Sequence, residues 1–193
     1  MKKTTLPGKS ARNSKKQLRL LCAAALLAAL SIVLGKYLAI PLGDSVRISF
    51  ENLPVLMAGV FLGPVTGCIV GVVADILGCL LVGYTINPII TVGAALIGAL
   101  SGLIMAFFRK NHPRLTVPSV CLAVAVAHIM GSMIVKSIGL AVYYATPMPI
   151  LLLRIPTYIV IGLLESTILC LLARNKLFTG ELDRLLRNHR KGG

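Results

Sequence analysis

Polar side chains at helical spacing inside two apolar stretches are the first sign of chemistry in this sequence. His128, Ser132 and Lys136 recur every four residues, which places them on one face of a helix. A second polar stripe follows and contains Arg154, Thr157, Tyr158 and Glu165. Because lipid does not accept such groups, the two stripes are expected to face each other inside a bundle. The guanidinium of Arg154 can hold a carboxylate through two hydrogen bonds, so this stripe indicates an anion-binding site.

Other charges are expected at a similar depth. With a rise of about 1.5 Å per residue, Lys136 and Arg154 lie about one turn below the outer surface, and Asp75 lies about two turns below it. Arg47, in the first outer loop, completes a layer with a surplus of positive charge that suits an anionic solute with polar ring edges. Two other interpretations of Lys136 stay open, because it can extend to the headgroups or form a structural pair with Asp75. His128 can equally be a hydrogen-bonded core histidine.

The same residues give little support for catalysis. His128 and Ser132 are the residue types of an acyl-transfer pair, but they lie one turn apart on one helix, and no G-x-S-G context surrounds the serine. No catalytic residue is therefore expected, and an intramembrane enzyme is the competing class. All five cysteines lie in apolar segments without paired spacing, so the sequence predicts neither a disulfide framework nor a metal site.

The elements that position these residues follow from the composition. Of the 193 residues, 56% are hydrophobic and only six are acidic, a balance typical of a membrane protein. A spanning helix needs about 20 apolar residues. Six runs approach or reach this length, over 18–40, 53–63, 65–83, 87–108, 117–140 and 148–173. The predicted fold class is all-α, a bundle of six transmembrane helices in the cell membrane.

Positive charge predicts the orientation of the bundle. The net charge of +14 is clustered at the ends of apolar runs, not on a solvated face with aromatic residues, so nucleic-acid binding is not expected. The two terminal segments and the loop near 109–114 hold 16 of the 20 Lys and Arg residues. With six spans these segments share one side, so both termini are predicted to be cytoplasmic. Basic tails over 1–17 and 174–193 would flank a substrate-binding transmembrane domain over 18–173.

The first apolar run carries a face of small residues, A-x-x-x-A in two overlapping copies, made of Ala24, Ala25, Ala28 and Ala29. Such a face serves either packing within the bundle or contact with another membrane protein. No G-x-x-x-x-G-K-[ST] sequence occurs, so the chain has no visible means of using ATP. If it pumps a solute, a partner must supply the energy.

Taken together, these features resemble a known family. The stretch "LPVLMAGVFLGPVTGCIVGVVADILG" is similar to the substrate-binding S component of energy-coupling factor (ECF) vitamin transporters, and the resemblance covers about residues 18–173. The start "VRISFENLP" and the later "GYTINPIITVGAALIGALSG" are most similar to the folate-type branch. The G-P-x-x-G and G-x-x-x-D-x-x-G elements are fairly specific for S components and much less so for the vitamin.

The resemblance implies a protein that captures a vitamin from outside and joins a transmembrane T component and two ABC-type ATPases. The cofactor of transport would be ATP, used by those partners and not by this chain. The resemblance also implies that Ala24, Ala25, Ala28 and Ala29 dock on the T component. It places the site in the outer half of the bundle, whose elements here hold Arg47, Asn52, Tyr84, Asn87, His128, Lys136, Tyr143, Arg154 and Tyr158.

A folate fits this set of residues. Its carboxylates suit Arg47, Lys136 or Arg154. Its pterin edge offers donors to Asp75 or Asn87, and its rings can stack on Tyr84 or Tyr143. Since the chain has no Trp and few aromatic residues, a smaller anionic vitamin such as pantothenate stays open, as does a stand-alone membrane carrier.

Overall fold

The structure, a computed structural model, describes residues 7–42, 46–111, 116–175 and 179–180. The chain is a series of helices, interrupted once by two consecutive short strands, and three segments are π-helical (η). In order, the elements are α1 (Pro7–Ile32), η1 (Val33–Tyr37), β1 (Ile40–Leu42), β2 (Val46–Ile48), α2 (Asn52–Met57), η2 (Ala58–Leu62), α3 (Pro64–Val82), α4 (Pro88–Asn111), α5 (Val117–Ala127), η3 (His128–Val135), α6 (Lys136–Tyr144) and α7 (Met148–Arg174). The all-α prediction is confirmed for the bundle, to which a small hairpin is added.

Five helices in the described part of the chain are long and apolar enough to cross a membrane. They cover Gln17–Tyr37, Pro64–Val82, Pro88–Lys110, Val117–Tyr144 and Met148–Arg174. The sixth apolar helix, Asn52–Leu62, is shorter. These bounds agree closely with the six predicted runs, because the need for apolar residues across the bilayer fixes where such helices begin and end. The first helix starts earlier than predicted, since α1 extends back to Pro7 into the predicted tail.

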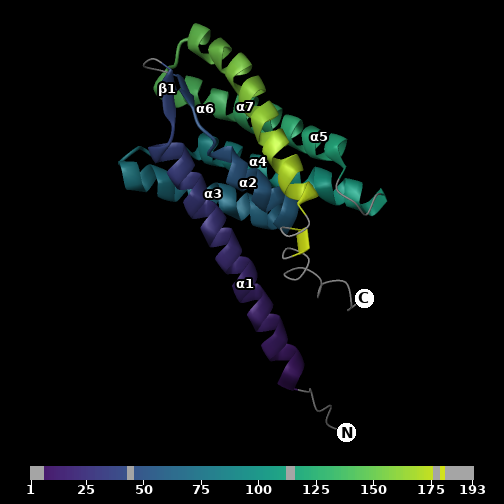
Figure 1. The fold of residues 1–193 in the computed structure, drawn as a ribbon. Coiled ribbons are helices and arrows are strands. Elements are labelled where there is room, and N and C mark those ends of the chain that lie inside the picture. Colours follow the sequence, from purple (N-terminus) through teal and green to yellow (C-terminus); the bar gives the residue numbers. More distant parts are fainter. Residues whose placement is uncertain (1–6, 43–45, 112–115, 176–178, 181–193) are drawn as a thin grey trace.

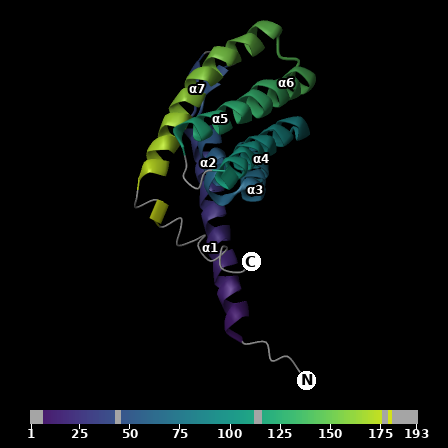
Figure 2. The same ribbon diagram turned by 90° about the vertical axis from the view of Figure 1, so that its right-hand side faces the viewer.

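The first and last helices run in opposite directions along one side of the bundle (Figures 1 and 2). The N-terminal half of α1 extends well beyond the other helices in both views, whereas α7 crosses the face formed by α5 and η3. The start of α1 and the end of α7 face the same way. This arrangement is compatible with the predicted common side of the termini, which stays a prediction.

Helices α3 and α4 form the tightest seam of the bundle. A Cβ atom on Gly98 would overlap the carbonyl oxygen of Gly67, so the two backbones touch where both residues lack a side chain. Gly63, at the turn into α3, has φ 107°, a conformation that glycine adopts without strain. Pro64 then occupies the first turn of α3, where its missing N–H costs nothing. The seam provides a rigid base on which the other helices pack.

The hairpin β1–β2 lies in the loop between η1 and α2, which is the predicted first outer loop. Its strands are antiparallel, and Arg47 pairs with Pro41. The chain then enters α2 through Glu51, whose carbonyl oxygen accepts a 2.6 Å hydrogen bond from the hydroxyl of Ser31. A Cβ on Gly35 would come within 2.7 Å of the Glu51 Cβ, so η1 and Glu51 are in close contact. The hairpin and the end of α1 therefore fix the position of Glu51.

Candidate functional site

A cavity lies between η1, the start of α2, α6 and α7, and we call it the outer cavity because this end of the bundle is the predicted outer side. It consists of two overlapping spaces of about 540 and 560 Å³. Both spaces are lined by Lys36, Glu51, Tyr84, Leu140, Tyr144, Arg154 and Tyr158. Because seven lining residues are shared, the two spaces form one site. Its volume lies in the range of about 300–1,000 Å³ that is usual for small-molecule sites.

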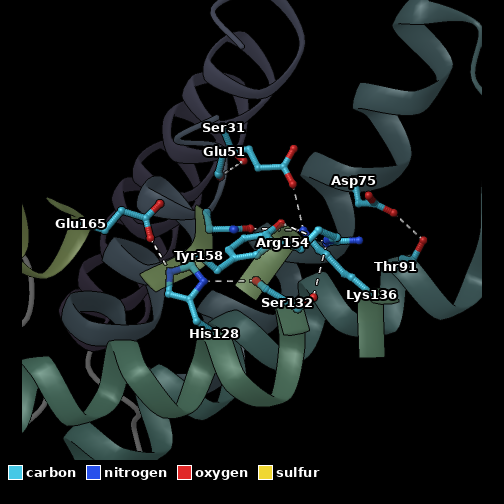
Figure 3. Close-up of polar contacts among 11 residues, drawn as sticks. Ser31, Glu51, Asp75, Thr91, His128, Ser132, Lys136, Arg154, Tyr158 and Glu165 are labelled. Atoms are coloured by element: carbon cyan, nitrogen blue, oxygen red, sulfur yellow. Dashed lines mark hydrogen bonds and ion pairs between the residues drawn. The ribbon is translucent and has the colours of Figure 1, made fainter. Parts of the chain in front are cut away.

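Arg154 is held on one side of this cavity and leaves one nitrogen unused. Its Nη2 donates to the carbonyl oxygen of Ser132 at 3.4 Å and to the hydroxyl of Tyr158 at 3.2 Å (Figure 3). The guanidinium also lies 5.3 Å from the centre of the Tyr158 ring. Its Nη1 is buried and has no hydrogen-bond partner among the described residues. A buried donor without a partner is costly, so this nitrogen is suited to receive a ligand acceptor.

Lys136 forms a buried ion pair with an acid that the sequence interpretation left out of the site. Its Nζ donates to Glu51 Oε1 at 2.9 Å and to Asn52 Oδ1 at 3.2 Å. The expected structural pair with Asp75 is therefore not the one that forms. Lys136 is 5% exposed, which also argues against extension to the headgroups. The Lys136 ammonium lowers the pKa of the Glu51 carboxyl, so Glu51 remains an anion at neutral pH.

Asp75 and Asn87 both line the cavity but make different contacts. The hydroxyl of Thr91 donates to Asp75 Oδ2 at 2.6 Å, and Asp75 lines the deep part of the cavity. Asn87 Oδ1 accepts the backbone N–H groups of Ile89 and Ile90 at the start of α4, and its Nδ2 donates to the carbonyl oxygen of Gly139. Asn87 thus uses its amide to join α4 to α6, although it also lines the cavity.

Lys36 adds a cation that is not among the predicted site residues. It lines the cavity on η1, and its Nζ lies 5.6 Å from the centre of the Tyr84 ring. Tyr84 follows the end of α3 and lines the same cavity. Lys36 and Arg154 therefore supply positive charge from two different helices.

Three predicted site residues, Asn52, His128 and Tyr143, line neither of the two spaces, and the side chain of a fourth is not described. His128 is buried behind Tyr158, where its ring nitrogens contact Glu165 and Ser132. Tyr143 is 53% exposed and lines neither space, whereas the neighbouring Tyr144 lines both. Arg47 lies in β2, but its side chain is outside the described residues. Tyr144, and not Tyr143, is the aromatic residue that α6 presents to the cavity.

The arrangement separates two kinds of chemistry within one site. Asp75 and Glu51 offer carboxylate oxygens on the α3 and α2 side, and Arg154 offers an unpaired donor on the α7 side. Tyr84, Tyr144 and Tyr158 supply aromatic surface between them. The site can therefore bind an elongated ligand that donates hydrogen bonds at one end and carries an anion at the other. No group of three or more His, Cys, Asp or Glu residues among the described residues could hold a metal ion.

The small-residue face of α1 is divided between two environments. Ala28 is 5% exposed and belongs to the core, and Ala24 is partly buried against that core. Ala25 and Ala29 are exposed. The predicted docking face is therefore reduced to the side that carries Ala25 and Ala29, because the other side already packs within the bundle.

Solved structures of similar fold are S components. The chain resembles the structure titled as FolT bound with folic acid, with 23% identity, a TM-score of 0.65, and coverage of 82% of this chain and 95% of that one. It resembles the S component of a bacterial ECF transporter with 23% identity and a TM-score of 0.60, covering 91% and 99% of the two chains. An S component for biotin has 22% identity and a TM-score of 0.57, covering 83% and 94%. At these identities the likeness establishes the fold.

The sequence itself settles the family. No curated protein matches the chain. The family model described as "ECF-type riboflavin transporter, S component" matches residues 15–175, most of the chain. Together with the five spanning helices, this match makes the chain an integral membrane protein. The chain belongs to the family of S components of ECF-type transporters.

Proposed function

We propose that this S component captures folate or a reduced folate at the outer face of the membrane, for ATP-driven uptake by partner subunits. The observation that carries the proposal is the unpartnered Nη1 of Arg154 at the outer cavity. A folate carboxylate would complete the hydrogen bonding of this guanidinium. A charge-assisted contact of this kind is worth about 1.5–3 kcal/mol.

The opposite end of the cavity suits the pterin. A pterin ring offers adjacent N–H donors, and Asp75 offers carboxylate oxygens of which Thr91 contacts Oδ2. Tyr84 and Tyr144 provide aromatic surface for a flat ring between the two ends. The sequence similarity of "VRISFENLP" and "GYTINPIITVGAALIGALSG" to the folate-type branch supports the same assignment, as does the fold of the folate-bound FolT.

Riboflavin is the second candidate, because the family model that matches carries its name. Riboflavin has a flat ring system and hydroxyl groups but no carboxylate, so it would leave the unpartnered Nη1 of Arg154 without an anionic acceptor. Pantothenate has one carboxylate but no ring to cover the tyrosine surfaces. Folate has both features, and it is therefore the preferred ligand.

Binding to the isolated protein tests this proposal. Purified protein in detergent, without ATP or partners, is titrated with folate, a reduced folate, riboflavin, pantothenate and biotin by isothermal calorimetry. Tight binding of folate or the reduced folate, with much weaker binding of riboflavin, pantothenate and biotin, is expected. Tight binding of riboflavin alone would replace the substrate and leave the S-component assignment intact. Mass spectrometry of a small molecule that co-purifies gives an independent answer.

Transport requires partners that the chain does not contain. We propose that it joins a T component and two ABC-type ATPases, which use the ATP, and that it needs no cofactor and catalyses no reaction itself. Within the family resemblance, delivery follows from reorientation of the loaded bundle in the membrane. The basic segments at the ends and near 109–114 would then lie on the cytoplasmic side.

The exposed side of the α1 small-residue face is the proposed docking surface for the T component. Replacing Ala25 and Ala29 with Leu fills this side without changing the core, so the pair variant should bind folate normally but lose co-purification with the T component. The matched control replaces the exposed Leu26 with Ile, which leaves the small residues in place. Undiminished assembly of the pair variant would remove α1 from the docking surface.

A further inference from the structure

A buried His–Glu pair lies outside the outer cavity, and the proposed function does not account for it. His128 is 3% exposed and Glu165 is 0% exposed. His128 Nε2 lies 2.5 Å from Glu165 Oε2, and Glu165 Oε1 has no partner among the described residues. Ionisable groups inside a membrane bundle are costly, and burial of an incompletely paired carboxylate adds to this cost. A buried pair of this kind contributes little net stability by itself, which favours a role in the binding site.

Two contacts lead from this pair to Arg154. His128 Nδ1 lies 3.2 Å from Ser132 Oγ, and the carbonyl oxygen of Ser132 accepts from Arg154 Nη2. On the other side, the His128 ring lies 5.6 Å from the ring of Tyr158, whose hydroxyl accepts from the same Nη2. Figure 3 shows His128 at the point where both routes meet. Both hydrogen bonds that the guanidinium donates to described residues therefore end on residues that contact His128.

The backbone at this point is also unusual. His128 begins the π-helical segment η3, and Ser132 lies inside it. π-Helical turns are rare and are frequently found at functional sites. A π-helix closes its turns on different carbonyl groups from an α-helix, so the Ser132 carbonyl is placed where a straight α-helix would not place it. The ring of His128 also contacts the side-chain hydroxyl of Ser132.

We propose that His128 and Glu165 are positioning residues that hold Arg154 in its ligand-binding orientation through Ser132 and Tyr158. This inference rests on the proposed role of Arg154 in the cavity. The Glu165 carboxylate accepts a hydrogen bond from Nε2–H of His128, which fixes the plane of the imidazole. The fixed ring packs against Tyr158 and contacts the Ser132 hydroxyl, and these two residues fix Nη2 of Arg154. Nη1 is thereby left directed to the ligand.

The test measures the freedom of Arg154 directly. The full-length protein is treated with phenylglyoxal, an arginine reagent, and the rate of Arg154 modification is followed by peptide mass spectrometry. His128→Ala and Glu165→Leu should each raise this rate by about 2- to 10-fold, the factor for loss of one hydrogen bond. Glu165→Gln should retain the wild-type rate, because its side-chain oxygen still accepts from Nε2–H. Ser166→Ala, next to Glu165, is the matched control and should change nothing, because the Ser166 hydroxyl donates to the Leu163 carbonyl oxygen of its own helix.

Folate affinity gives the second measurement. His128→Ala should weaken binding by up to about tenfold in the wild-type background. It should have no further effect in an Arg154→Ala background, because a residue that acts through Arg154 loses its influence when Arg154 is absent. Equal losses in both backgrounds would overturn the proposal, as would unchanged labelling of Arg154.

The two proposals can fail separately. If the wild-type protein binds no folate, the substrate assignment fails, and the labelling rates alone decide whether His128 and Glu165 position Arg154. If His128→Ala does not fold, Ser132→Ala replaces it, since that variant removes the hydroxyl contact and leaves the histidine pair in place. Faster labelling of Arg154 in Ser132→Ala supports the proposal, and an unchanged rate contradicts it.

Discussion

The outer cavity and the seam between α3 and α4 are packed in opposite ways within one bundle. The seam removes side chains, so that Gly67 and Gly98 bring two backbones into contact and leave no space. The cavity gathers charged side chains from several helices, and the Nη1 of Arg154 has no partner there among the described residues. The difference indicates that the seam supplies rigidity, while the polar groups are placed where a ligand can compensate for their burial.

The largest expected effect is on the seam. Gly98→Ala should destabilise the protein by about 3 kcal/mol, because the new methyl group overlaps the Gly67 carbonyl oxygen and no rotamer change can relieve a backbone contact. Gly162→Ala is the matched control on α7, where a Cβ meets only His128 Cδ2 at 3.5 Å. That variant should be neutral or more stable by up to about 1 kcal/mol. Thermal unfolding in detergent measures both, and equal stability of the two variants would show that the seam is not tightly packed.

The next largest effect separates binding from stability at the cavity. Arg154→Ala should weaken folate binding by about 10- to 100-fold, the range expected for a charge-assisted hydrogen bond, with little change in the unfolding temperature. Arg174→Ala removes the same charge from the other end of α7 and should leave the affinity unchanged. Calorimetric titration of the two variants gives the comparison. Full affinity in Arg154→Ala would remove this residue from the site.

A smaller effect concerns the ion pair at the cavity. Because Lys136 lowers the pKa of Glu51 below its ordinary value of 4.5, the pair contributes stability that is fully present above about pH 4.5 and is lost as the pH falls through the folded-state pKa. Glu51→Gln should therefore reduce the difference in unfolding temperature between about pH 7 and pH 3. Glu181→Gln, outside the described residues, is the matched acidic control. The same acid sensitivity in Glu51→Gln and in the wild type would contradict the pairing.

The number and ends of the helices could be predicted because the bilayer imposes a length on each apolar run. Arg154 and Asp75, which the rise per residue predicts at similar depth, line the same cavity. Which side of each helix faces the cavity was harder to predict. Lys36 lies in η1, and Tyr143 and Tyr144 follow η3, so the rotation of these side chains cannot be counted along a straight α-helix. The interpretation accordingly chose Tyr143 where the structure presents Tyr144.

Glu51 was missed for a different reason. Its position depends on the hairpin, on the Ser31 hydroxyl and on the close approach of Gly35, three contacts between segments that are distant from Lys136 in the sequence. Only the fold brings Glu51 and Lys136 together. A useful signal was nevertheless present, because Glu51 is one of only six acidic residues and directly precedes an apolar helix. In such a chain every acid near the outer surface is a candidate partner for a buried lysine.

The smallest expected effect is on the tyrosine ring of α6 that lines the cavity. The same experiment tests which way the side chains of α6 point after the π-helical segment η3. Tyr144→Ala should weaken folate binding by about tenfold, because the ring lines both parts of the cavity and its hydroxyl donates to the Thr85 carbonyl oxygen at 3.3 Å. Tyr143→Ala removes an identical side chain one position earlier, which faces away from both parts, and should leave the affinity within about twofold of the wild type. A larger loss from Tyr143→Ala than from Tyr144→Ala in the same titration would mean that α6 is rotated in the ligand-bound protein. The cavity would then be shaped by the ligand, whereas the α3–α4 seam would keep the same packing in both states.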